Sequence, residues 1–135
     1  MIIEFMPRED QPEELLAYLG VNKKSAGWRY LLFCFLEVAG GCTPGVEVYE
    51  RAALIHGSTA GRVVLECQRA LYRAQRKQPQ EWEEISPRLE TDVSRVGPTL
   101  FLHHAAAWLR RNRIGYFYLG RVRHLVPASE WEENS

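Results

Sequence analysis

The middle of the chain carries arginines and a glutamate at alternating spacings of four and three residues. In an α-helix, residues at these spacings share one face, so the side chains would form a single polar stripe. Guanidinium groups pair with phosphate oxygens and donate two parallel hydrogen bonds to guanine. The stripe therefore predicts a helix face that could bind duplex DNA. Its members are Arg62, Glu66, Arg69, Arg73 and Arg76.

The same spacing is also typical of an ordinary solvated helix. Glu66 lies four residues after Arg62 and three before Arg69. Oppositely charged pairs at these spacings stabilise an exposed helix by about 0.2–0.5 kcal/mol each. From the spacing alone, DNA contact and a solvated surface both stay open.

The stripe needs a helix to hold it, and the sequence predicts one over residues 59–76. Apolar residues recur on its opposite face, as expected for a helix packed on a core. They are Val63, Cys67, Ala70, Leu71 and Ala74.

A second helix is expected directly before it. Thr43 and Pro44 form its start signal, a capping hydroxyl followed by a ring that fits the first helical turn. Gly57 can end this helix in a left-handed conformation, and Ser58 or Thr59 can cap the next one. Residues 44–77 therefore predict a helix-turn-helix, a motif whose second helix can enter the major groove.

Four further segments have helical periodicity: residues 13–19, 25–38, 81–85 and 99–111. Segment 25–38 is apolar nearly all round, which indicates a helix enclosed by others. The expected heart of the core lies there, in Trp28, Leu31, Leu32, Phe35 and Leu36. Segment 78–98 is a polar connection with apolar anchors at Trp82, Ile85 and Leu89, and helix 99–111 turns Phe101, Leu102, Ala105, Ala106 and Leu109 inward.

Residues 113–131 change character, because β-prone residues replace the helical pattern. We expect a hairpin with its bend at Leu119-Gly120, followed by a turn of helix at residues 129–132. A basic hairpin beside a helix-turn-helix is called a wing, and Arg121 and Arg123 would point to one side of it and bind DNA. An edge strand that carries arginines for solubility fits the pattern equally.

The composition is that of a single globular domain. The chain has 135 residues, 46% of them hydrophobic, and a formal net charge of zero, which argues against nonspecific coating of nucleic acid. Its three widely spaced cysteines predict neither a disulfide framework nor a zinc site. No secretory signal or membrane-spanning run is found, so we expect a cytoplasmic protein without membrane contact.

No pattern predicts catalysis. The sequence has no Gly-rich phosphate loop, no nucleophile with a nearby base and no paired-carboxylate motif. The adjacent His103 and His104 would point about 100° apart on a helix and could not chelate a metal together. We therefore expect no enzyme, no cofactor and no metal site.

Several segments together resemble a known family, the C-terminal DNA-binding effector domain of the sporulation initiation response regulator of spore-forming Firmicutes. The likeness is carried by Leu19-Gly20-Val21, Gly27-Trp28-Arg29-Tyr30-Leu31, Val48-Tyr49, Ala53, Thr59-Ala60-Gly61-Arg62-Val63, Ala70-Leu71, Phe101-Leu102, Ala105-Ala106 and Leu109-Arg110. It covers roughly residues 13–112. The resemblance implies an all-helical domain whose helix 59–76 enters the major groove of a promoter box. Arg62 would contact the DNA, and Ser58 and Thr59 would take phosphate or cap positions.

The chain departs from this family on the turn expected to face DNA. Gly61, Val64 and Leu65 stand where the family has a serine, an acidic residue and an arginine. Loss of a bidentate arginine removes about 1–3 kcal/mol of discrimination between bases. The family's receiver domain is also missing from this sequence, so phosphorylation is not the expected switch. The tail lies outside the match, and residues 118–123 are faintly similar to the hairpin of excisionase-type winged helices.

These observations predict a mainly α protein, a helical bundle containing a helix-turn-helix, with a C-terminal β-hairpin that could serve as a wing. Residues 1–12 would be a lead-in segment, residues 13–112 the effector-like domain, and residues 113–135 a hairpin or wing-like extension of it. The expected function is sequence-specific transcriptional regulation, with double-stranded DNA as the partner. The alternative is a protein-interaction module of the same fold that has lost base reading and binds through Val64 and Leu65.

Overall fold

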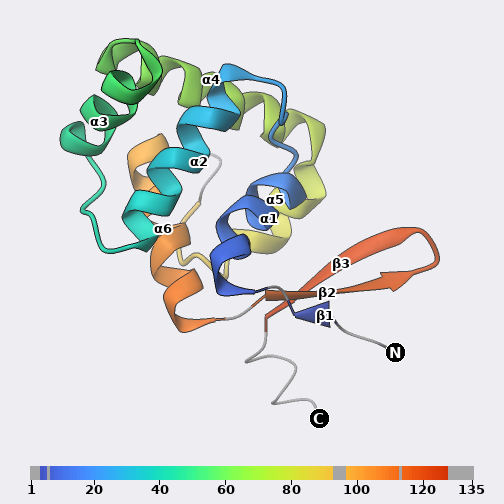
Figure 1. Ribbon diagram of the computed structural model, residues 1–135. Coiled ribbons are helices and arrows are strands. Elements are labelled where there is room, and N and C mark those ends of the chain that lie inside the picture. The colour runs from blue at the N-terminus through green and yellow to red at the C-terminus, as the bar shows by residue number, and fades with distance from the viewer. Residues whose placement is uncertain (1–3, 6, 93–96, 113, 128–135) are drawn as a thin grey trace.

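The computed structural model describes residues 4–5, 7–92, 97–112 and 114–127, and these are mainly helical (Figure 1). A short 3-10 helix, Arg8–Asp10, leads into the α-helices. They are α1 (Gln11–Tyr18), α2 (Ala26–Ala39), α3 (Val46–His56), α4 (Ala60–Lys77), α5 (Pro79–Ile85) and α6 (Pro98–Arg111). The strands are β1 (Glu4–Phe5), β2 (Ile114–Leu119) and β3 (Val122–Pro127).

Helix α2 lies at the centre of the helical body and packs against α1, α3, α4 and α6. Leu31 and Phe35 are fully buried, and the ring of Phe35 meets the ring of Phe101 edge to face at 6.2 Å. The prediction of complete enclosure was wrong for Leu36, which is 46% exposed. Within the described residues, Leu36 therefore lies on a side of α2 that is open to solvent.

The central helix approaches α4 closely at one glycine. A Cβ atom added to Gly27 would stand 2.4 Å from the Ala70 Cβ and 2.6 Å from the Glu66 carbonyl oxygen. Real side chains do not approach one another so closely. The backbone of α2 at Gly27 therefore packs directly against α4, and the absence of a side chain at Gly27 allows the short distance between the two helices.

A side-chain cap and a left-handed glycine fix two helix ends where the sequence indicated them, whereas α1 and α5 each begin two residues before the predicted start and have no side-chain cap. Ser25 accepts a hydrogen bond from the Trp28 amide at 3.1 Å and begins α2. Gly57 adopts φ 64° and ends α3. The start signal at Thr43 and Pro44 was misread, because α3 begins two residues later, at Val46, after Gly45 in a positive-φ conformation (153°) and without a side-chain cap.

Helix α5 anchors the connecting segment through Trp82 and Ile85, which are buried as the sequence predicted. The Trp82 indole Nε1 donates to the Leu19 carbonyl oxygen at 2.9 Å, and its ring lies 5.5 Å from that of Phe101. These contacts hold α5 against the C-terminal end of α1 and against α6.

The strands form an antiparallel sheet in the order β1-β2-β3. The hairpin was predicted, but its bend falls one residue later than expected, because Leu119 still pairs with Val122 and the turn is Gly120-Arg121. On the face toward the helices, the ring of Tyr116 lies 6.2 Å from that of Tyr18 in α1. The helix expected at residues 129–132 lies outside the described residues.

Candidate nucleic-acid interface

The predicted polar stripe lies on the solvent face of α4. The apolar set on the opposite face is buried as predicted: Val63, Cys67, Ala70, Leu71 and Ala74. The arginines of the stripe, Arg62, Arg69, Arg73 and Arg76, are all exposed. Core packing therefore fixes the rotation of α4 about its axis and turns four guanidinium groups outward along a single helix.

Glu66 is the acidic member of the stripe and is partly buried, with 19% of its side chain exposed, whereas the Arg69 side chain is 54% exposed. Its carboxylate accepts a hydrogen bond from Arg69 Nη1 at 3.4 Å. A pair this long, with an exposed guanidinium, contributes little to stability, because water and salt screen it. It restrains one arginine of the stripe and leaves Arg62, Arg73 and Arg76 without a recorded carboxylate partner among the described residues.

The two hydroxyl residues before α4 have different environments. Thr59 caps the helix, since its Oγ1 accepts a hydrogen bond from the Arg62 amide at 3.2 Å. The Ser58 Oγ is buried and has no hydrogen-bond partner among the residues that the structure describes. In this rotamer the Ser58 hydroxyl does not reach a surface ligand, so of the two expected phosphate or cap positions only Thr59 has a defined role.

Thr59→Ala should therefore lower the free energy of unfolding by about 1 kcal/mol, because an N-terminal amide of α4 loses its acceptor. Urea denaturation followed by circular dichroism measures this change. Ser58→Ala is the matched control: it removes a buried hydroxyl that makes no hydrogen bond, so it should leave stability unchanged or raise it. Equal losses in the two variants would contradict the capping assignment.

The exposed face of α4 also carries Tyr72, a residue that the predicted stripe did not include. Tyr72 is 61% exposed, and the Arg76 guanidinium lies 5.7 Å from the centre of its ring. The signal was present in the sequence, because an aromatic residue four positions before an arginine on an exposed face permits this stacking. Tyr72 pre-orients Arg76 and offers an apolar ring to a ligand.

The positions at which the chain departs from the resembled family fall into two environments. Leu65 is 42% exposed and stands among the arginines, and a Cβ on Gly61 would meet no atom within 4 Å. Val64 is partly buried and packs against the core. At these positions Leu65 and Gly61 are therefore accessible to a ligand, whereas Val64 is accessible only in part.

The C-terminal hairpin lies apart from the stripe. In Figure 1, α4 runs along the top of the helical body, whereas β2 and β3 leave the body below α1. Arg121 is exposed in the turn and does not lie on a strand, so the expectation that it alternates with Arg123 along one strand was wrong. Arg123 lies in β3 and pairs with Tyr118, but its side chain is outside the described structure.

Burial favours the protonated form of the two buried thiols. Burial, with a smaller contribution from Glu37, raises the pKa of Cys34 to about 12, and burial also raises the pKa of Cys67. Neutral thiols of this kind are poor nucleophiles and poor metal ligands. Across the described segments no group of His, Cys, Asp or Glu could hold a metal ion, and no helix combines the length and apolarity required to cross a bilayer.

No family model, no curated protein and no solved structure matches this chain.

Proposed function

We propose that this protein is a sequence-specific DNA-binding transcriptional regulator in which α3, the turn at residues 57–59 and α4 act as a helix-turn-helix. The observation that carries the proposal is the exposed arginine face of α4, held outward by a fully apolar inner face. The resemblance to the effector domain of the sporulation regulator family also supports the proposal, because it includes residues 59–63 at the start of α4.

The length of α4 divides the stripe into two parts. A helix rises about 1.5 Å per residue, so Arg62 and Arg76 are separated by roughly 21 Å along the axis. The major groove is about 12 Å wide, and recognition helices contact base edges mainly with their N-terminal residues. Arg62 is therefore proposed as the base reader, and Arg69, Arg73 and Arg76 as contacts to flanking phosphates.

Phosphate contacts would supply most of the affinity and make it depend steeply on salt, because neutralised phosphates release their counterions. Arg121, at the tip of a separate projection, is proposed as an additional phosphate contact, with the hairpin acting as a wing. Arg121→Ala would then weaken binding to all duplexes alike.

The test is a selection from random duplexes, followed by titration of the enriched DNA at low and moderate salt. We expect an enriched motif that Arg62→Ala binds more weakly by about 1–3 kcal/mol, with binding to unrelated duplexes changed far less. Arg29→Ala is the control, since Arg29 is exposed on α2 and its loss changes net charge equally. If no motif is enriched, or if Arg62→Ala and Arg29→Ala behave alike, the proposal fails.

A second candidate function is favoured by Leu65, an exposed apolar residue in the middle of the stripe. A protein-interaction module that has lost base reading would use this residue to bind a partner protein. Such a module with zero net charge should show little retention on heparin or duplex DNA at any salt concentration. Steep, salt-dependent retention would favour the regulator.

A further inference from the structure

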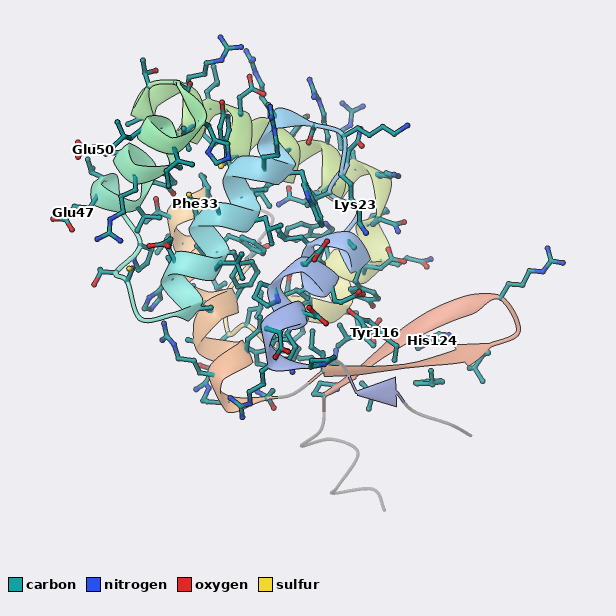
Figure 2. The ribbon with its side chains drawn as sticks, in the orientation of Figure 1. Lys23, Phe33, Glu47, Glu50, Tyr116 and His124 are labelled. Atoms are coloured by element: carbon teal, nitrogen blue, oxygen red, sulfur yellow. The ribbon has the colours of Figure 1, made fainter. Side chains whose placement is uncertain are left out.

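The outer face of α3 combines exposed apolar and acidic side chains. Leu54 is 84% exposed, more than any other large hydrophobic side chain in the described segments, and Val46 is 67% exposed. Glu47 and Glu50 lie three residues apart, and Figure 2 shows both on α3, directed away from the helical body. Leu54 follows one turn after Glu50, so the three side chains share one face.

The negative charge of this face is not compensated within the described chain. Neither Glu47 nor Glu50 forms an ion pair with another described residue. The only arginine of α3, Arg51, is held by the Glu37 carboxylate at 2.8 Å and lies 3.4 Å from the Cys42 thiol. The α3 face therefore offers two carboxylates and an apolar side chain to an outside ligand.

The same residues line a shallow hollow. Glu47, Glu50, Arg51 and Leu54 surround a volume of about 340 Å³ on the surface of α3. A helix of this length presents about three turns, which is the size of surface that one amphipathic helix covers. An apolar side chain of such a helix would rest on Leu54.

We propose that the outer face of α3 docks a basic amphipathic helix of a protein partner. The argument is charge complementarity: basic side chains one turn apart would pair with Glu47 and Glu50, while an apolar residue between them covers Leu54. The face is distinct from the α4 stripe, and its negative charge repels a phosphate backbone. A partner bound there leaves the arginines of α4 free to hold DNA, so the inference goes beyond the proposed function and can fail separately from it.

The experiment is a selection of phage-displayed helical peptides against the full chain, with the enriched peptides then synthesised and titrated. We expect enrichment of basic residues three or four positions apart next to an apolar residue. Binding should shift backbone amide resonances of α3. Glu47→Lys combined with Glu50→Lys should weaken it by about tenfold or more.

The matched control is Glu83→Lys combined with Glu90→Lys, which makes the same change in net charge elsewhere on the surface and should alter affinity by less than about twofold. Leu54→Ser is the second variant, and it should weaken binding without any change in charge. Circular dichroism confirms that each variant is folded. If no such peptide is enriched, or if both double variants weaken binding alike, the proposed site is wrong. Self-association of the chain that Glu47→Lys and Glu50→Lys abolish would also overturn it, since the occupant would then be a second copy.

Discussion

Phe101→Ala is expected to lower the free energy of unfolding by about 3–5 kcal/mol. The side chain is 1% exposed, and its ring meets those of Phe35 at 6.2 Å and Trp82 at 5.5 Å. These contacts join α6 to α2 and to α5. Truncation would leave a cavity where three helices meet, and the aromatic contacts on both sides would be lost together.

Urea denaturation followed by tryptophan fluorescence measures this loss, and the fluorescence is informative because Trp82 lies next to the cavity. Leu100→Ala is the matched control on the same helix. Leu100 is 50% exposed, so its truncation should change stability by no more than about 0.5 kcal/mol. Similar losses for the two variants would contradict the placement of Phe101 in the core.

Gly27→Ala should destabilise the protein by about 1–3 kcal/mol, because the new methyl group has no room between α2 and α4. Its nearest neighbours would be the Ala70 Cβ and the Glu66 carbonyl oxygen, at 2.4 and 2.6 Å. Backbone atoms cannot move aside as a flexible side chain does, so α4 itself must shift. The predicted loss exceeds the gain of up to about 1 kcal/mol that alanine normally brings to a helix.

Gly61→Ala provides the comparison for Gly27→Ala. Both glycines are the second residue of their helix, but a Cβ on Gly61 would meet nothing within 4 Å. Gly61→Ala should therefore be neutral or stabilising, and the two substitutions should differ in sign when measured by thermal unfolding. The same sign for both would show that helix propensity, and not the contact with α4, decides the outcome.

The helices could be predicted from the sequence because their signals are local. The period of Val63, Cys67 and Ala70 identified the buried face of α4, and the left-handed requirement at Gly57 identified the end of α3. Leu36 was misplaced because an apolar pattern does not reveal whether a neighbouring helix is present to cover it. The start of α3 was misplaced because Gly45 precedes it without any capping side chain.

The candidate site was predicted only in part. Exposure of the arginines followed from periodicity, but no local pattern indicated that the Ser58 hydroxyl is buried. The bend of the hairpin was off by one residue, which moved Arg121 from a strand into the turn. A shift of one residue along a strand reverses the side to which a side chain points. The predicted direction of a side chain is therefore least accurate next to a turn.

The pairing of β1 with β2 has a consequence for how the protein folds. Glu4 lies opposite Tyr116, 112 positions later (116 − 4 = 112), whereas α3 and α4 are neighbours in the sequence. Closing a loop of that length has a large entropic penalty, so contacts between distant segments form slowly. The adjacent helices can associate first and bring the two segments near each other. During synthesis β1 has no strand to pair with until β2 has left the ribosome, so we expect β1 to join the sheet after the helices have associated.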